Sequence, residues 1–262
     1  MKIVIRFLTL TILLITLNGC EKEPPKLKGW ILIWNDEFED PALDSTKWRA
    51  LTRTSSYNEE QQAYLPQNIT IKDGCLVFTS NKESYTGDDN FNPGNTVTRS
   101  YTSGLVDSYG KFSFKYGRVE IRAKLPKTKG IWPAHWLLPE DNTWPPEIDI
   151  MEMLGDNPKT VYFANHWGAD PKHHYSYGSD PINGPNFSKR FHTFMIEWKP
   201  GIIHWFIDNK LKFASSKGVS DKTMYILLNT AVGGSWPGNP DQTTLFPQKH
   251  RIDYIRVYQT TE

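Results

Sequence analysis

Three carboxylates lie close together in the segment Glu147-Ile148-Asp149-Ile150-Met151-Glu152. Side chains of a β-strand alternate between its two faces, so Glu147 and Asp149 are expected to share one face. Strict alternation would then place Met151, and not Glu152, beside them. One extra residue, a β-bulge, would reset the phase and bring Glu152 onto the acidic face. Carboxylates crowded in this way repel one another and raise at least one pKa, which is more readily tolerated at a functional site than elsewhere.

Two other interpretations of this segment are a solvated strand face and a metal site. A solvated face is rarely surrounded by so many indole rings, and here Trp132, Trp136 and Trp144 precede the carboxylates while His166 and Trp167 follow them. Carboxylate oxygens do bind hard cations. No nearby segment, however, has the regular ligand spacing of a cation-binding loop. The segment therefore predicts acid–base chemistry.

The composition points away from nucleic acid and towards carbohydrate. The chain of 262 residues has a net charge of +1, so it offers no basic field for nucleic acid and no acidic field for cationic partners. It contains 10 Trp, and 13% of its residues are aromatic. This is more than a core of this size usually needs. Because the flat apolar rings of Trp and Tyr suit the C–H faces of sugars, the excess predicts a carbohydrate cleft.

The N-terminus has the pattern of an export signal. Lys2 and Arg6 precede a short apolar run, Phe7 to Leu17, which is too short for a stable membrane span. The ending Leu17-Asn18-Gly19-Cys20 resembles a bacterial lipoprotein signal, and an ordinary cleavage site is the alternative. We expect residues 1–19 to be the signal peptide, Cys20 to carry lipid, and residues 20–29 to form a tether. Cys75 would then have no disulfide partner.

Residues 30–262 are expected to form one all-β domain, a two-sheet antiparallel sandwich. The predicted strands are short, rich in β-branched or aromatic residues and separated by turn signals. No stretch sustains a helical period over three turns. Two polar stretches, 82–99 and 169–186, are expected to be long loops. The predicted strands are Leu76–Thr79, Lys111–Lys115, Arg118–Lys124, Val161–Asn165, Thr193–Trp198, Ile203–Ile207, Met224–Thr230 and Ile252–Tyr258, with a hairpin over 204–211.

The carboxylate segment resembles the active-site signature of glycoside hydrolase family 16 in its bulged, laminarinase-like form. The likeness runs from about Trp34 to Gln259. It implies a β-jelly-roll sandwich with a cleft on the concave face, and a retaining, endo-acting hydrolase of β-linked glucans. Further segments resemble the family in the same order: Asp36-Glu37-Phe38, Asn58 through Tyr64, 116–120, 130–136, 231–238 and 253–258.

Retaining cleavage uses two carboxyl groups about 5–5.5 Å apart, one as nucleophile and one as acid and then base. The resemblance assigns Glu147 as the nucleophile and Glu152 as the acid/base. Asp149 lies between them, and its charge would keep Glu152 protonated and orient Glu147. Such a group titrates as a unit.

The resemblance also implies residues that contact the sugar. His166 is expected beside the catalytic strand, where it would bond a carboxylate or a sugar hydroxyl. Trp132, Trp136 and Trp236 are candidates for sugar stacking, with core packing as the alternative, and Asn58 and Arg99 are candidate polar contacts. His135 departs from the pattern, because these enzymes commonly carry an apolar or aromatic residue there.

No cofactor is expected for catalysis. The family often carries one structural Ca²⁺ on the face away from the cleft. Its ligands here would be the backbone oxygens of Glu37 and Gly74 together with backbone and side-chain oxygens of Asp253. Oxygen-only ligation of this kind suits Ca²⁺.

These patterns favour an endo-β-1,3-glucanase that acts as a monomer on a polysaccharide and is held by its lipid on the outer membrane, facing outward. Mixed-linkage β-1,3-1,4-glucan, or a galactan such as agar, porphyran or carrageenan, would keep the mechanism and change the sugar. A glycan-binding lipoprotein without activity is the third alternative. The intact carboxylate set argues against it, because binding alone does not need that set.

Overall fold

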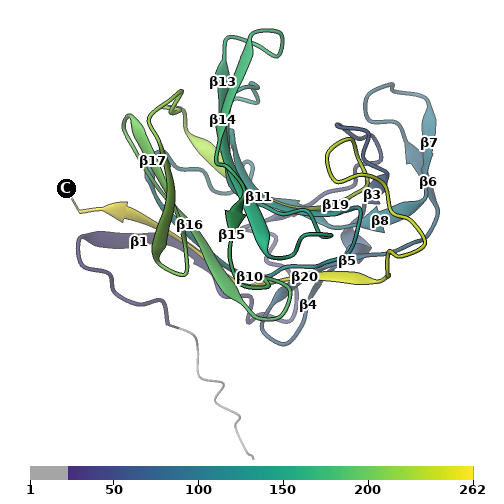
Figure 1. Ribbon diagram of the computed structural model, residues 1–262, viewed down its shortest axis with the longest axis horizontal. Coiled ribbons are helices and arrows are strands. Elements are labelled where there is room, and N and C mark those ends of the chain that lie inside the picture. Colours follow the sequence, from purple (N-terminus) through teal and green to yellow (C-terminus); the bar gives the residue numbers. More distant parts are fainter. Residues whose placement is uncertain (1–22, 262) are drawn as a thin grey trace, which may run out of the picture.

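Two antiparallel sheets of eight strands each stack face to face in the computed structural model, which describes residues 23–261 (Figure 1). The first sheet has the order β18-β17-β16-β10-β20-β5-β4, with β1 also paired to β20. Its strands are β1 (Trp30–Asp36), β4 (Ile69–Ile71), β5 (Leu76–Ser80), β10 (Gly117–Lys124), β16 (His192–Lys199), β17 (Ile202–Ile207), β18 (Lys210–Ser215) and β20 (Gln248–Thr260).

The second sheet, here called the cleft sheet, has the order β14-β13-β12-β11-β19-β9-β2, with β15 also paired to β13. Two small ribbons complete the fold: β3 (Gln62–Tyr64) with β8 (Tyr101–Ser103), and β6 (Tyr85–Asp88) with β7 (Thr96–Arg99). A short 3-10 helix covers Pro66–Asn68. The strands of the cleft sheet are β2 (Arg49–Ala50), β9 (Leu105–Asp107), β11 (Ile131–Pro139), β12 (Glu147–Glu152), β13 (Thr160–Gly168), β14 (His174–Gly178), β15 (Ile182–Asn183) and β19 (Met224–Val232).

The core lies between the two sheets. Trp198 and Trp205 of the first sheet meet Ile150, Met151 and Phe163 of the cleft sheet, and all five side chains are fully buried. Each large apolar side chain removed from water in this way stabilises the fold by roughly 1.5–3 kcal/mol. The all-β, two-sheet antiparallel sandwich predicted from the sequence is confirmed. No helix in the described part of the chain is long and apolar enough to cross a membrane.

Strand β20 joins the first sheet together. It pairs with β10 along one edge, and along the other edge it pairs with β5 near its start and with β1 near its end. The β5 pairing stops at Ile252 and the β1 pairing at Ile255, so a gap opens between them. Asp253 lies in this gap, and it is also the extra residue of a β-bulge opposite β10, where Ala123 faces Ile252 and Arg122 faces Tyr254.

A pair of buried histidines lies between the sheets. His135 on β11 and His250 on β20 are fully buried, and their Nε2 atoms are 3.1 Å apart. Thr230 hydroxyl oxygen lies 3.1 Å from Nδ1 of His250. Burial lowers the pKa of both rings, to about 3 for His250, so one neutral ring donates to the other. His135 therefore points into the core, and the unusual residue type at this position does not reach the cleft.

Most predicted strands are confirmed to within a few residues, but 111–115 is not a strand. Lys111 and Phe112 donate their amides to the carbonyl of Ser108 in a turn, and only Phe114 makes a bridge, to Met224. The alternating Phe112 and Phe114 imitate a strand because both pack on the core. The two stretches expected to be loops contain strands: 82–99 holds the β6–β7 hairpin, and 169–186 holds β14 and β15.

Candidate active site

The predicted bulge in β12 is confirmed by the strand register. Asp149 lies opposite Ala164 of β13 and Glu152 lies opposite Tyr162, so three steps along β12 match two along β13. The same offset appears against β11, where Trp136 faces Asp149 and His135 faces Met151. Ile150 and Met151 consequently both enter the core, while Glu147, Asp149 and Glu152 all line the cleft.

A cross-sheet hydrogen bond supports this bulge. The indole nitrogen of Trp205, on β17 of the first sheet, donates to the backbone carbonyl of Asp149 over 2.8 Å, and both groups are buried. A bulge interrupts the ladder, and a buried carbonyl without a partner is costly. Trp205 therefore stabilises the irregular strand from the opposite side of the core.

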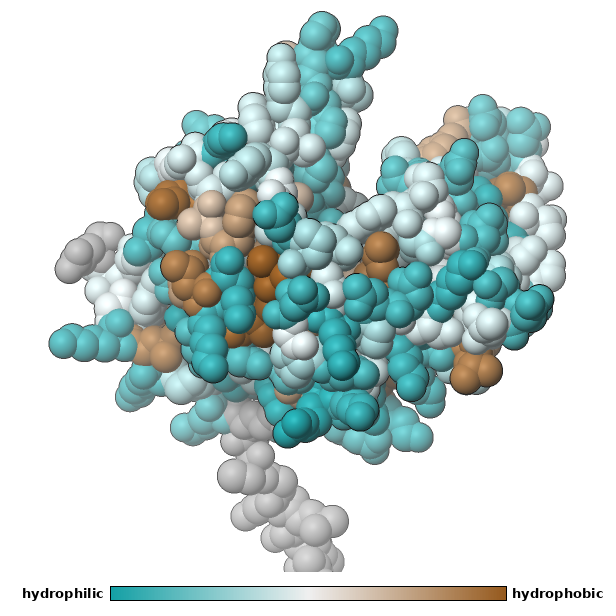
Figure 2. Space-filling view, in the orientation of Figure 1, coloured by the Kyte–Doolittle hydropathy of each residue, from teal (hydrophilic) through white to brown (hydrophobic). Residues whose placement is uncertain are grey.

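The carboxylates lie in a cleft of about 720 Å³. Figure 2 shows the hollow, which opens between the projecting β13–β14 hairpin and the lobe that carries β6 and β7. Side chains of β9, β11 and β19, together with Leu51 directly after β2, form its floor. They include Leu51, Leu105, Ala134, Tyr225, Leu227, Asn229 and Ala231.

Glu147 and Glu152 have different surroundings although both are close to Asp149. Trp144 donates its indole N–H to Glu147 over 2.6 Å, and Trp132 donates to Glu152 over 2.9 Å. Burial raises the pKa of Glu147 to about 8, and the charge of Asp149 adds to the rise, whereas the charge of His166 opposes it. Burial raises the pKa of Glu152 further, assisted by the charges of Asp149 and Glu147, and no cation opposes that rise.

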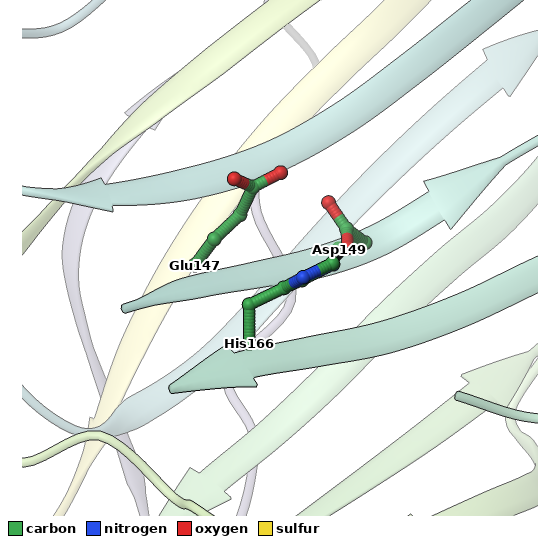
Figure 3. A group of neighbouring side chains, drawn as sticks. All are labelled: Glu147, Asp149 and His166. Atoms are coloured by element: carbon green, nitrogen blue, oxygen red, sulfur yellow. Dashed lines mark hydrogen bonds and ion pairs between the residues drawn. The ribbon is translucent and has the colours of Figure 1, made fainter. Parts of the chain in front are cut away.

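His166 reaches the acidic face from the neighbouring strand, as the resemblance implied. Figure 3 shows Glu147 and Asp149 projecting on the same side of β12 while the His166 ring extends from β13 towards Asp149. Its Nε2 lies 3.0 Å from the Oδ2 of Asp149. Burial alone would lower the pKa of His166, but the hydrogen bond and charge of Asp149, with the charge of Glu147, leave that pKa raised. An imidazolium is thus favoured beside the carboxylates.

One ligand atom each from Glu147, Asp149 and His166 lie within 4.8 Å of one another, a spacing that could hold a metal ion. The carboxylates nevertheless accept hydrogen bonds from N–H donors: the Trp144 indole at Glu147 and the imidazole at Asp149. Each carboxylate keeps other lone pairs, but an imidazolium has none to offer a metal ion, so the raised pKa of His166 disfavours metal binding here. The arrangement is therefore suited to proton transfer and to holding a carboxylate anion.

The structure brings most of the predicted sugar-contact residues to the cleft. Trp132, Trp136 and Asn58 line it, and Trp136 donates its indole N–H to Asn229 over 2.9 Å. Trp236 packs edge-on against Trp132, with ring centroids 5.3 Å apart, and its side chain stays largely exposed at the rim.

Arg99 lies outside the lining of the cleft. Its Nε donates to the backbone carbonyl of Thr54 over 2.6 Å, and its Nη1 lies 3.4 Å from the carbonyl of Glu60. The guanidinium thus bonds to both ends of the segment 54–60, which contains Asn58. This is a supporting position and differs from the direct sugar contact predicted for Arg99.

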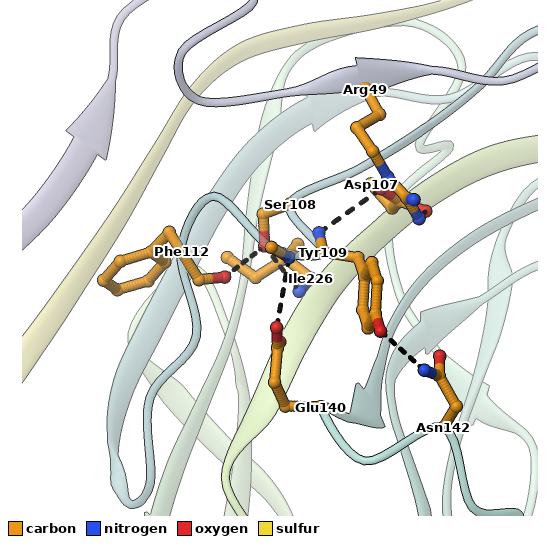
Figure 4. Close-up of polar contacts among 9 residues, drawn as sticks. Arg49, Asp107, Ser108, Tyr109, Phe112, Glu140, Asn142 and Ile226 are labelled. Atoms are coloured by element: carbon orange, nitrogen blue, oxygen red, sulfur yellow. Dashed lines mark hydrogen bonds and ion pairs between the residues drawn. The ribbon is translucent and has the colours of Figure 1, made fainter.

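The wall at one end of the cleft was not predicted from the sequence. Arg49 forms a two-pronged ion pair with Asp107, at 2.7 and 2.6 Å, and its guanidinium lies over the Tyr109 ring (Figure 4). Asn142 donates to the Tyr109 hydroxyl over 2.6 Å. Arg49, Asp107 and Asn142 line the cleft, yet they come from three separate segments without a shared motif. Only the fold brings them together.

Deletion of Met151 tests the bulge. Removing one residue takes out the bulge, and regular alternation then leaves the glutamate on the cleft face but displaced along β12 by up to about 3.3 Å, one residue, from its partner Trp132. We expect reduced hydrolytic activity, because Glu152 moves relative to Glu147 and Trp132, together with a lower melting temperature, because the core loses the buried Met151 side chain. Met151→Leu, which keeps the residue count and the side-chain volume, is the matched control and should retain activity. Wild-type activity in the deletion variant would show that the bulge is dispensable.

Comparisons with known proteins agree with this geometry. The model of the glycosyl hydrolases family 16 matches residues 57–256. The chain is 34% identical over 279 residues to a beta-glucanase of Rhodothermus marinus, covering 95% of this chain and 94% of that protein. It is similar to the catalytic domain of an endo-1,3-beta-glucanase (laminarinase) from Thermotoga petrophila RKU-1, with 39% identity, a TM-score of 0.78, and 89% and 99% of the two chains covered.

A further similar structure comes from work on endo-acting O-glycanases with which members of the human gut microbiota initiate mucin breakdown. It shares 33% identity and a TM-score of 0.81, over 91% of this chain and 95% of that one. The family model spans most of the chain, and the resemblance first seen in the carboxylate segment extends over both sheets. The chain therefore belongs to the glycosyl hydrolases family 16.

Proposed function

We propose that this glycoside hydrolase is a retaining endo-β-1,3-glucanase in which Glu147 is the nucleophile and Glu152 the acid/base. The observation that carries the assignment is the position of His166, which lies opposite Glu147 in the strand register and has a ring nitrogen within 4.8 Å of its carboxylate, whereas Glu152 lies opposite Tyr162. A cation, His166, favours the ionised form of Glu147, and nothing comparable acts on Glu152, whose pKa is raised further. A retaining mechanism needs one carboxylate and one carboxylic acid.

In the first step, Glu152 donates its proton to the glycosidic oxygen while the Glu147 carboxylate attacks the anomeric carbon. The bond to the departing chain breaks and a glycosyl–enzyme ester forms. In the second step, Glu152, now ionised, removes a proton from water, and that water cleaves the ester and regenerates Glu147. The negative charge of Asp149 raises the pKa of Glu152, which helps Glu152 to accept a proton in the second step.

The cleft supports an internal cut in a long polymer. Its floor crosses the cleft sheet from Arg49 on β2 to Glu147 on β12, and an open-sided channel of this kind accepts a chain along its length. The similarity to an endo-1,3-beta-glucanase (laminarinase) favours laminarin-type glucan, whereas the similarity to a structure from work on O-glycanases favours a mucin glycan.

Product analysis separates these substrates. Laminarin should be cut into a ladder of oligosaccharides, with slower release of reducing ends from lichenan and none from agarose, carrageenan, porphyran or mucin O-glycans. Glu147→Gln serves as the inactive control for each polymer. Preferred cleavage of a galactose-based polymer would overturn the glucan assignment. Binding of laminarin by the wild type without any release of reducing ends would favour the glycan-binding alternative.

Substitution of the two glutamates tests their roles. Glu147→Gln should lower kcat by about 10³-fold or more, because an amide cannot form the ester. Glu152→Gln should be nearly as severe on laminarin but milder on an aryl glycoside, whose leaving group needs no acid. In the wild type, activity should fall at low pH as Glu147 is protonated and at high pH as Glu152 is deprotonated. Glu152→Gln, assayed on the aryl glycoside, should lose only the alkaline fall.

Retention of more than a tenth of the wild-type activity by Glu147→Gln would contradict the nucleophile assignment. Persistence of the alkaline fall in Glu152→Gln would contradict the acid/base assignment. Both variants are isosteric, so their circular dichroism and melting temperatures should remain close to those of the wild type.

We also propose a structural Ca²⁺ in the gap beside Asp253. This proposal is supported by the strand order: Glu37 directly follows β1, Gly74 shortly precedes β5, and these two strands border the gap that contains Asp253. The backbone carbonyls of Glu37 and Gly74 and both kinds of oxygen of Asp253 would be the ligands. The donor set, three carbonyls and one carboxylate, suits Ca²⁺. The Glu37 side chain is held by Arg256 at 2.9 Å for both contacts, and Arg122 pairs with Asp253. A bound cation would compete with Arg122 and link the end of β1 and the start of β5 to the middle of β20.

Chelation tests this site. Since Ca²⁺ would bind only the folded state, removing it should lower the melting temperature and leave the initial rate at low temperature unchanged. At a free Ca²⁺ concentration 100-fold above Kd, the stabilisation would be about 2.7 kcal/mol. Asp253→Asn should weaken the response of the melting temperature to Ca²⁺, while Arg122→Gln, which removes only the competing cation, should preserve it. An immediate loss of rate without unfolding would indicate a metal in the cleft instead.

The lipoprotein assignment concerns Cys20, which lies outside the described residues, and it stands as a proposal. It is supported by the segment Leu17-Asn18-Gly19-Cys20 directly after a short apolar run. An outward-facing position on the outer membrane fits an enzyme whose polymer is too large to cross it. Cys20→Ser should move the protein from the membrane fraction to the soluble or unprocessed fraction, because acyl chains supply the anchor. Equal membrane association of processed wild type and variant would exclude a lipid anchor.

A further inference from the structure

His174 is in contact with the two groups that support Glu147 and Asp149. It begins strand β14, where it lies opposite Gly168 of β13. Its Nε2 is 2.8 Å from Nδ1 of His166, and the two ring planes are inclined by only 11°, which suits a hydrogen bond in the plane of both rings. On its other side, its ring centroid lies 4.7 Å from that of Trp144.

These contacts connect His174 to Asp149 and to Glu147 by two separate routes. One runs from His174 through His166 to Asp149, and the other runs from His174 by ring packing to Trp144, whose indole donates to Glu147. His174 lies 22 or more residues from each carboxylate in the sequence, and neither carboxylate contacts it directly. The His174 side chain, on the projecting β13–β14 hairpin, therefore contacts both His166, the partner of Asp149, and Trp144, the partner of Glu147.

The arrangement of protons allows His166 to change its charge without losing a bond. An ionised carboxylate only accepts, so Nε2 of His166 donates to Asp149. When His166 is neutral, its Nδ1 accepts from His174; when His166 is charged, its Nδ1 donates to His174. Burial lowers the pKa of His174, and the charge of His166 lowers it further, so His174 remains the neutral member of the pair.

The backbone fixes this contact. Gly168 has a φ of 147°, and a Cβ there would lie 2.0 Å from the carbonyl oxygen of His173. Only glycine therefore lets β14 close onto β13 at this point. The other titratable groups of the elements packed here are Glu147 and Glu152 on β12, Asp170, Lys172 and His173 in the turn, and Lys217 after β18. Of these, Asp170 pairs with His173, and Lys217 lies over the Tyr177 ring.

We propose that His174 is a positioning residue for the hydrolysis: it holds the His166 ring against Asp149 and holds the Trp144 indole against Glu147. This inference rests on the proposed function, because it assigns His174 to the nucleophile side of that reaction. Loss of the His174 nitrogen would weaken the charged form of His166, and with it the ionised form of Glu147.

Two substitutions separate the two contacts. His174→Phe keeps a ring against Trp144 and removes the nitrogen, whereas His174→Gln keeps an amide near the position of Nε2 and removes the ring. His174→Phe should lower kcat on laminarin by up to about 100-fold, as small misplacements in an active site do. It should also move the acidic fall of kcat/KM to higher pH, because Glu147 loses a nearby cation. His174→Gln should restore the acidic fall to its wild-type position.

His173→Phe is the matched control. His173 is the adjacent residue, its side chain is 70% exposed, and its polar contacts are confined to Asp170. It should keep the wild-type kcat and pH profile. A wild-type kcat and acidic fall in His174→Phe would overturn the proposal, and so would an equal loss in His173→Phe, which would reduce the effect to the stability of the hairpin.

A spectroscopic measurement distinguishes failure of this inference from failure of the proposed function. The ¹⁵N resonances of the His166 ring report its charge and tautomer without any substrate. In His174→Phe the His166 ring should titrate at lower pH than in the wild type, and in His174→Gln it should not. An unchanged His166 titration in His174→Phe would refute the inference even if laminarin is hydrolysed, whereas a shifted titration in a protein that cuts no glucan would refute only the glucanase assignment.

Discussion

The extra residue between Asp149 and Glu152 is the constraint on which the active site depends. With regular alternation, Glu152 would point between the sheets, where Ile150 and Met151 now lie. Burying a carboxyl there would cost several kcal/mol, far more than a bulge does. The bulge in turn leaves the backbone carbonyl of Asp149 outside the ladder. The indole N–H of Trp205, in the opposite sheet, donates a hydrogen bond to it. The catalytic strand is thus shaped by both sheets of the sandwich.

Given that strand, the surrounding N–H donors separate the three carboxyl groups chemically. Trp144 and Trp132 occupy equivalent roles at Glu147 and Glu152, since each donates one indole hydrogen. The difference comes from His166, which faces Asp149 and Glu147 but not Glu152. A single imidazole on the next strand therefore breaks the symmetry of two otherwise similar glutamates. Its own orientation depends on a hairpin that projects beyond the sheet.

The parts of the site that follow from alternation could be predicted from the sequence. Glu147, Asp149 and Glu152 are close neighbours in one strand, so their spacing alone indicated the bulge. Strand β11 gave no strand signal, because Pro133 and Pro139 interrupt the pattern, although it carries Trp132 and Trp136. The β14 strand was mistaken for loop because its residues are mostly exposed and polar.

Contacts between distant segments could not be predicted in this way. Arg99 looked like a sugar contact because it is a polar residue in a presumed loop, yet its position in β7 directs it to the backbone of Thr54. The pairing of Arg49 with Asp107 depends on the register of β2 against β9. His174 had no recognisable motif, and its relation to His166 arises only from the close approach of two strands at Gly168.

The position of β20 in the chain has a consequence for the order of folding. This strand supplies the edges on which β1, β5 and β10 pair, yet it comprises residues 248–260 and is synthesised last. Until it emerges from the ribosome, β1 has no partner, and the β10–β16–β17–β18 part of the first sheet is not joined to the β4–β5 part. The first sheet can therefore be completed only when synthesis is nearly finished, and part of its apolar inner face stays uncovered until then.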